Sequence, residues 1–276
     1  MIRPDRCPWQ PCPSGRYLSR PSGRVPRSTM MTPMTAMPAV TAMPPETAAP
    51  PETAAPARPL RPVQALLVVD VQTAFVSGAE AVPEAARVLD RTRGLLARAR
   101  TAGALVVHLQ NDGAPGAVDA PHTPGWELHL PVEPGPREHV VRKTEDDGFA
   151  DTGLGALLDA AGVTELAVCG VLSEMCVAAT ARTALELGHR VVLPHDAHAT
   201  YDIPAAPDIS DTVPAAMSSR AAEWALGDEV EIVPRAAAVP FVAPPLAPAP
   251  EAPAAAAAPA AGTGLSPAGP PPAPAR

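Results

Sequence analysis

The stretch that decides the fold is residues 166–200, LAVCGVLSEMCVAATARTALELGHRVVLPHDAHAT. It begins with a short apolar strand at 166–169, breaks at Gly170, and resumes with apolar or small residues at helical spacing. Gly188 ends the predicted helix, and a second apolar strand follows at 191–193. A strand, loop, helix and strand of these lengths form a right-handed crossover between parallel strands. The stretch therefore predicts an α/β fold.

Cys176 occupies a chemically favourable place in this unit. It lies in the first turn of the predicted helix, just outside the carboxyl end of a strand, where open α/β sheets bind their ligands. The unpaired N–H groups and the helix dipole at such a turn favour the thiolate. Free cysteines more often act as small buried hydrophobes. We interpret Cys176 as a candidate nucleophile, and Cys169 as a core residue.

Two further charged residues follow predicted strands of the same sheet. Asp70 interrupts the apolar strand 65–71, and Lys143 follows the strand 139–142. A carboxylate in a buried strand is costly without a partner, so Asp70 needs one. A structural salt bridge would meet that need as well as a catalytic role would, and an isolated lysine is usually a solvated charge.

Three separated motifs resemble those of the isochorismatase-like cysteine hydrolases. They are ALLVVDVQTAF with Asp70, VVRKTEDDGF with Lys143 and GVLSEMCV with Cys176, and the resemblance covers residues 63–241. It implies that these three residues are catalytic. It also implies a cis peptide bond between Val171 and Leu172, and an oxyanion hole made by the backbone N–H groups of Leu172 and Cys176.

The other predicted elements complete a three-layer α/β/α domain. Its parallel sheet has six strands, in the order 3-2-1-4-5-6, and Asp70 and Cys176 follow the adjacent first and fourth strands, where the winding reverses. The remaining strands are predicted at 105–110 and 230–233, and the remaining helices at 84–102, 154–161 and 212–226.

Several residues are candidates for the substrate pocket, each with an alternative role. Trp126 lies in a long Gly/Pro-rich loop at 111–139 and could instead anchor that loop. The carboxylates that begin at Glu145 could bind a cation, or simply form a solvated loop. His198 could serve as the base of a Cys-His dyad, which we rank below the Asp-Lys-Cys arrangement. Gln72 and Phe75 follow Asp70 and could line the pocket.

The sequence predicts no catalytic metal and no cofactor. Nicotinamidases of the family bind a metal through an Asp-x-His motif after the second strand. The corresponding segment here reads HLQNDG and lacks that motif. His122 and His129 remain as possible ligands in the following loop.

The two ends of the chain differ from its middle in composition. Residues 1–62 and 242–276 are rich in Pro, Ala, Thr and Ser, include a tandem PETAAP repeat, and are predicted to be disordered. The N-terminus lacks the apolar run of a secretory signal, and no window is apolar enough to span a membrane. We expect a soluble, cytoplasmic protein, whose translation starts at Met1 or at Met30 or Met31.

Charge is distributed unevenly along the chain. Residues 1–61 hold eight Arg and three acids, a net +5, whereas residues 62–242 hold twelve Lys and Arg and twenty-five acids, a net −13. An acidic domain repels nucleic acid and anionic membranes and attracts small cations. The same charge could equally serve solubility alone.

The function that the resemblance implies is hydrolysis of an amide bond through a thioester. The segments PGWELH and 196–233 are most similar to the streptothricin hydrolase branch, whose members open a cyclic amide of a polycationic antibiotic and so confer resistance. The family also implies a homodimer or larger homo-oligomer. Alternatives are a nicotinamidase or carbamoyl-amide hydrolase, an isochorismatase that cleaves a vinyl ether without a cysteine, and a non-catalytic binding module.

Overall fold

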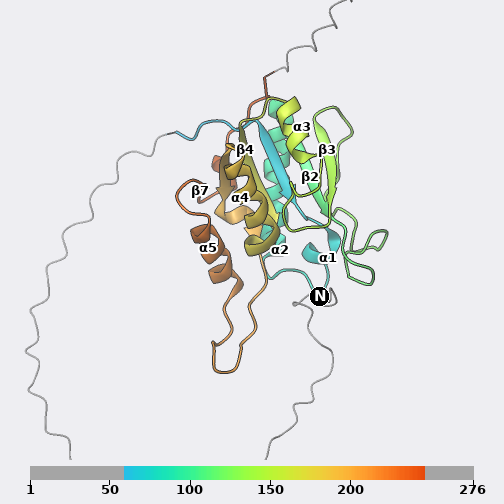
Figure 1. Cartoon of the computed structure of the whole chain (residues 1–276), viewed down its shortest axis with the longest axis vertical. Helices are drawn as coiled ribbons and strands as arrows, with labels where there is room; N and C mark the ends of the chain where they lie inside the picture. Colours follow the sequence, from blue (N-terminus) through green and yellow to red (C-terminus); the bar gives the residue numbers. More distant parts are fainter. Residues whose placement is uncertain (1–58, 246–276) are drawn as a thin grey trace, which may run out of the picture. The chain divides into compact units, whose positions relative to one another are not determined.

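A parallel β-sheet forms the centre of the protein (Figure 1). The computed structural model describes residues 59–245. The strand order is β3-β2-β1-β4-β5-β7, with β6 paired to β4 off this path. The strands are β1 (Ala65–Val69), β2 (Leu105–Asn111), β3 (Glu138–Lys143), β4 (Glu165–Val171), β5 (Arg190–Pro194), β6 (His198–Ala199) and β7 (Glu231–Val233).

The predicted α/β/α class and core strand order are confirmed, but the predicted number of six strands is wrong. The seventh strand is β6, a segment of two residues that pairs with Gly170 and Val171 at the end of β4. The sequence HDAHAT has no apolar run that would indicate a strand. Residues 198–199 become a strand only because they pair with the end of β4. β7 takes the sixth position that the sequence assigns to residues 230–233.

The predicted helices are present, except that the segment around Cys176 differs and α5 begins later, at Ala215. The short helix α1, at 73–76, has no counterpart among the predicted helices. A π-helical turn, η1 (Ser173–Val177), precedes the helix that the sequence predicts as a single element. The helices are α1 (Thr73–Val76), α2 (Ala85–Ala102), α3 (Leu154–Ala160), α4 (Ala178–Glu186) and α5 (Ala215–Ala225), with short 3-10 turns η2 (His195–Ala197) and η3 (Ala236–Ala238).

The alternation of side chains along β1 divides the core between the two faces of the sheet. Leu66 and Val68 belong to one apolar cluster with Leu95 and Leu96 of α2. Leu67 lies in the other cluster, with α3 and α4. Figure 1 shows α3 and α4 on one face of the sheet and α2 on the opposite face. Because both faces are covered, β1 is apolar throughout.

The register of the central strands brings their carboxyl ends together. Val69, the last residue of β1, pairs with Leu109 of β2 and with Gly170 of β4. Lys143, the last residue of β3, pairs with Asn111 of β2. The residues that follow β1, β3 and β4 therefore meet at one edge of the sheet.

The two ends of the predicted domain, at Val63 and Phe241, meet in the structure. Val63 forms an isolated parallel bridge with Phe241, so the two limits of the resemblance lie side by side. Within residues 59–245, no helix is both long enough and apolar enough to cross a bilayer. The segments predicted to be disordered, 1–62 and 242–276, fall outside the described residues except for 59–62 and 242–245. Within the first of these exceptions, Arg61 forms an ion pair with Glu165. The PETAAP repeat and the alternative starts also fall outside.

Candidate active site

Asp70 and Lys143 form a buried ion pair at the carboxyl edge of the sheet. Asp70 directly follows β1 and adopts the left-handed conformation, with a φ angle of 48°. Lys143 Nζ lies 2.8 Å from Asp70 Oδ2, and the side chains are 0% and 2% exposed. Lys143 also donates to the carbonyl of Glu145 at 3.1 Å and to Asn111 Oδ1 at 3.5 Å.

Burial and the neighbouring charges shift the pKa values of this pair. Burial raises the pKa of Asp70 above its ordinary value, and the Lys143 ammonium only partly offsets that effect. For Lys143, burial alone would lower the pKa, but the charges of Asp70 and Cys176 raise it. Asp70 Oδ1 is buried and has no hydrogen-bond partner among the described residues. The Cys176 thiol lies within reach of the Asp70 carboxylate, and its hydrogen bond opposes the rise of the Asp70 pKa.

Cys176 is held by the π-helical turn at the end of β4. The N–H of Val177 donates to the carbonyl of Leu172 at 3.1 Å, which closes the wide turn around the cysteine. The peptide bond between Val171 and Leu172 is cis. The thiol is half-buried and donates to Asp146 Oδ1 at 3.6 Å.

The expectation that Cys176 favours the thiolate is wrong for the resting protein. Burial raises the pKa of the Cys176 thiol, and the negative charge of Asp70 raises it further, which outweighs the opposite effect of Lys143. The thiol is therefore protonated at neutral pH. The helix terminus is visible in the sequence, whereas the burial that opposes the thiolate is not.

The acidic run after Lys143 divides into separate roles. Asp146 is exposed and meets the Cys176 thiol, a contact that the charge run suggests only as part of a cluster. Asp147 accepts hydrogen bonds from Thr183 Oγ1 at 2.8 Å and from the N–H of Phe149 at 2.9 Å. The side chain of Glu145 is exposed. Asp147 therefore holds the loop in place, while Asp146 and Glu145 remain open to a ligand.

Gln72 and Trp126 both take part in hydrogen bonds of the long loop beside the site. Gln72 is fully buried; its Nε2 donates to the carbonyls of Asn111 and Trp126 at 3.0 and 2.9 Å, and its Oε1 accepts from the N–H of Asn111. Trp126 Nε1 donates to Asp112 Oδ1 at 2.8 Å. These bonds anchor the long loop, which is the alternative role considered for Trp126.

Phe75 and His198 also lie away from the thiol contacts. Phe75, in α1, is partly buried against the core cluster that includes α2. His198 is 1% exposed, with Nδ1 2.8 Å from Ser173 Oγ and Nε2 3.0 Å from Glu223 Oε1. Both ring nitrogens are thus already paired, which removes His198 as a base for Cys176. Nothing in the local sequence indicates that His198 meets Ser173 or Glu223.

The histidines of the 111–139 loop form no cluster with other ligand-type side chains in the described part of the chain. His129 Nδ1 lies 3.4 Å from Thr73 Oγ1, and the His122 ring packs at a tilt against Trp126, with centroids 5.5 Å apart.

Comparison with known proteins places the chain in a family. Residues 64–223 match the model of the isochorismatase domain. The chain is 76% identical over 245 residues to the streptothricin hydrolase of Streptomyces noursei. The aligned region covers 89% of this chain and 90% of that enzyme. An uncharacterised isochorismatase family protein of Bacillus subtilis is 37% identical over 139 residues, or 49% of this chain and 77% of its own.

Solved structures agree with this match. An isochorismatase from Pseudomonas putida has a TM-score of 0.59 and 28% identity, over 67% of this chain and 94% of that one. A cysteine hydrolase from Pseudomonas syringae pv. phaseolicola has a TM-score of 0.56 and 25% identity, over 65% and 93% of the two chains. The chain belongs to the isochorismatase family. It is a hydrolase, and the bonds on which it acts are carbon–nitrogen bonds other than peptide bonds.

Proposed function

We propose that this protein hydrolyses the cyclic amide of a streptothricin-type antibiotic by nucleophilic catalysis, and so confers resistance. The similarity to the Streptomyces noursei enzyme, at 76% identity, supports the substrate class. The observation that carries the chemistry is the buried Asp70–Lys143 pair, with Nζ and Oδ2 2.8 Å apart, at the edge where Cys176 follows β4.

In the first step, Asp70 takes the proton of the Cys176 thiol. The raised pKa of Asp70 makes its carboxylate a stronger base than an exposed one. Lys143 is the counter-charge that keeps Asp70 ionised before the transfer, and it then faces the new thiolate. A thiol that is protonated at rest and activated only beside its base also resists unwanted reaction.

The thiolate sulfur then attacks the carbonyl carbon of the lactam. A C–S bond forms, and the carbonyl electron pair moves to oxygen, which the N–H groups of Leu172 and Cys176 would stabilise. Loss of one such donor typically costs about 3 kcal/mol of transition-state stabilisation. When the intermediate collapses, the C–N bond breaks and the nitrogen takes the proton that Asp70 holds.

Water completes the reaction by attacking the thioester. Asp70 accepts a proton from the water, the C–S bond breaks, and the thiolate recovers a proton. The products are a carboxylic acid and an amine, which remain in one molecule when the amide is cyclic. The net change is the addition of one water.

The acidic surface at the thiol suits a cationic substrate. Asp146 and Glu145 are exposed, and Asp146 Oδ1 lies 3.6 Å from Cys176 Sγ. An ammonium group of the substrate could bind to these carboxylates beside the thiol.

Mass spectrometry tests this proposal directly. Streptothricin incubated with the wild type should gain the mass of one water, and should gain none with Cys176→Ser. Cys169→Ala is the matched control, since Cys169 is fully buried in the core and should be dispensable for turnover. Acid-quenched wild type should carry a substrate adduct on the peptide that contains Cys176.

The alternative outcomes are distinct. Turnover that survives in Cys176→Ser would refute the nucleophile, and so the mechanism. If the wild type leaves streptothricin unchanged but hydrolyses nicotinamide or a carbamoyl amide, the substrate assignment is refuted and the mechanism is retained.

A further inference from the structure

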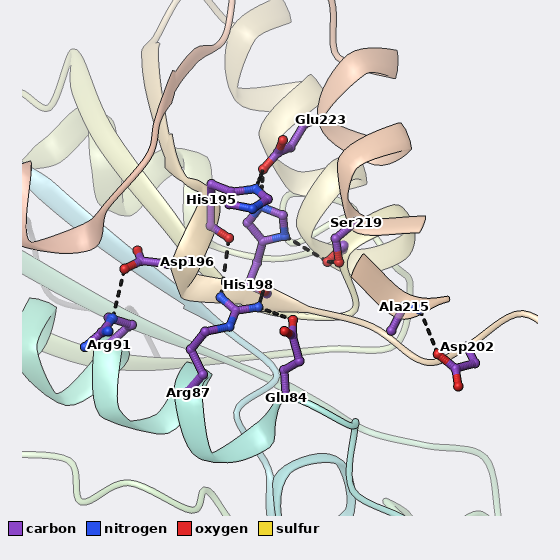
Figure 2. A network of polar contacts seen from close by, with 11 residues as sticks. Glu84, Arg87, Arg91, His195, Asp196, His198, Asp202, Ala215, Ser219 and Glu223 are labelled. Carbon is purple, nitrogen blue, oxygen red and sulfur yellow. Dashed lines mark hydrogen bonds and ion pairs between the residues drawn. The ribbon is translucent and has the colours of Figure 1, made fainter. Parts of the chain in front are cut away.

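A cluster of ligand-type side chains lies next to the turn that carries Cys176, since His198 contacts Ser173 of that turn. His195 and His198 come from the segment after β5, and Glu223 comes from α5 (Figure 2). Their ligand atoms all lie within 4.8 Å of one another. We propose that His195, His198 and Glu223 bind a divalent metal ion of the zinc type.

The three groups already converge on one point. Glu223 Oε1 lies 2.6 Å from His195 Nδ1 and 3.0 Å from His198 Nε2. Two imidazoles and one carboxylate are a ligand set that zinc adopts where a fourth position is left to water or another ligand.

Hydrogen bonds to their backbone carbonyls hold both histidines in place (Figure 2). The guanidinium of Arg87 donates to the carbonyl of His195 at 3.5 Å and to that of His198 at 3.2 Å. Between them, Asp196 accepts from Arg91 Nε at 2.8 Å and from the N–H of Ala236 at 2.6 Å. A ligand loop fixed in this way loses little conformational entropy when it binds an ion.

The hydrogen bonds of His198 suit a metal ligand. A histidine that binds a metal through one nitrogen usually donates the other N–H to a fixed acceptor. His198 Nδ1 lies 2.8 Å from Ser173 Oγ, and Ser173 Oγ lies 2.9 Å from Ser219 Oγ. Ser173 can accept from His198 and donate to Ser219. His198 can therefore turn its Nε2 lone pair to the ion by changing its tautomer, with no change of charge.

The site is open to solvent on one side. A cavity of about 140 Å³ adjoins the cluster and is lined by Glu84, Arg87, His195, Asp196, Ala216 and Ser219. The side chain of His195 is 48% exposed, whereas those of His198 and Glu223 are 1% exposed. An ion can enter through the cavity, and the fourth ligand would come from that side.

Within residues 59–245, none of the three proposed ligands is hydrogen-bonded to Asp70 or Lys143. The proposed ion differs from the metal considered in the sequence, which would lie in the 111–139 loop. The cluster is joined to the catalytic turn through Ser173, the first residue of η1, whose Oγ lies 2.8 Å from His198 Nδ1. We therefore infer that the ion stabilises the turn and takes no part in the bond cleavage.

Zinc binding can be measured without an activity assay. The full-length protein is dialysed against micromolar Zn²⁺ and its metal content determined, and cobalt substitution is followed by visible absorption. His195→Ala removes the exposed ligand, and Glu223→Gln removes the carboxylate charge at the same shape. We expect one zinc ion per wild-type chain. The zinc affinity of both variants should fall by more than the roughly 10- to 100-fold loss that follows a change outside the ligand shell.

Two control variants separate this site from others. His122→Asn alters the 111–139 loop with a residue that tolerates a positive φ, and Cys176→Ala removes the half-buried thiol. Both should keep the zinc. Zinc should also raise the melting temperature of the wild type but not of His195→Ala. Equal zinc content in His195→Ala and wild type, or wild type with no zinc above the blank, would overturn the proposal.

Discussion

At the scale of single residues, the environment of Asp70 determines how the reaction should depend on pH. Burial raises its pKa, and a protonated Asp70 cannot accept the thiol proton. We predict that kcat/KM falls as the pH is lowered through this raised pKa, with an acid limb above the ordinary carboxyl value of about 4. A pH–rate profile of the wild type measures it. An acid limb at or below the ordinary value would contradict the role of Asp70.

The same pair predicts a non-additive effect on stability. Asp70→Asn leaves the Lys143 ammonium buried without its counter-charge, which should cost about 3–5 kcal/mol of the free energy of unfolding. The double variant Asp70→Asn, Lys143→Met removes both charges and should cost less than Asp70→Asn alone. Urea denaturation at neutral pH measures both. Costs that simply add would show that the two charges are not coupled.

Some residue roles were visible in the sequence and others were not. The position of Asp70 inside an apolar run required a partner, and the structure supplies Lys143 as that partner, 2.8 Å away. Gln72 gave no such signal, because nothing local shows that its amide meets the backbone of Asn111 and Trp126. Contacts across dozens of residues depend on how loops pack and leave no periodic trace.

At the scale of elements, the end of β4 depends on Gly170. This residue has a φ angle of +125°, and a Cβ built on it would lie 2.0 Å from the carbonyl oxygen of Val69. A side chain there would push β1 and β4 apart directly beneath Asp70 and the cysteine turn. Glycine is required at this point both for its conformation and for the close approach of two backbones.

We predict that Gly170→Ala destabilises the protein by about 4 kcal/mol or more. Gly155→Ala, in the helix α3, is the matched control. A Cβ at Gly155 would meet only the Phe149 side chain, at 3.9 Å. That change should be neutral or stabilising by up to about 1 kcal/mol. Thermal or urea unfolding compares the two. A Gly170→Ala protein as stable as the control would contradict the proposed backbone contact.

The cysteine turn shows where periodicity is not enough. The spacing of apolar residues predicts one helix after Gly170, and most of it exists as α4 (Ala178–Glu186). The preceding π-helical turn uses the carbonyl of Leu172 as acceptor for both Met175 and Val177. A single wide turn changes the direction of one side chain without changing the apolar pattern around it.

At the scale of the whole molecule, charge should govern the capture of substrate. Residues 62–242 carry twelve Lys and Arg and twenty-five acids, a net −13. If the substrate is a polycation, KM should rise with ionic strength while kcat stays nearly constant, since salt screens charges beyond a Debye length of about 10 Å at 0.1 M. Steady-state kinetics over a salt series measures this. A KM that does not change with salt would show that the charge serves solubility alone.

The sequence by itself determined the class of fold, the core strand order and the family. The fold class and strand order follow from apolar runs whose period is imposed by the local geometry of helices and strands. The family follows from three motifs, with Asp70, Lys143 and Cys176, that occur in a fixed order. Only the tertiary structure decided the protonation of Cys176, the anchoring role of Gln72 and the cluster of His195, His198 and Glu223. The physical reason is common to all three. Burial, and hydrogen bonds between segments distant in the chain, depend on the packed arrangement and have no counterpart in local sequence.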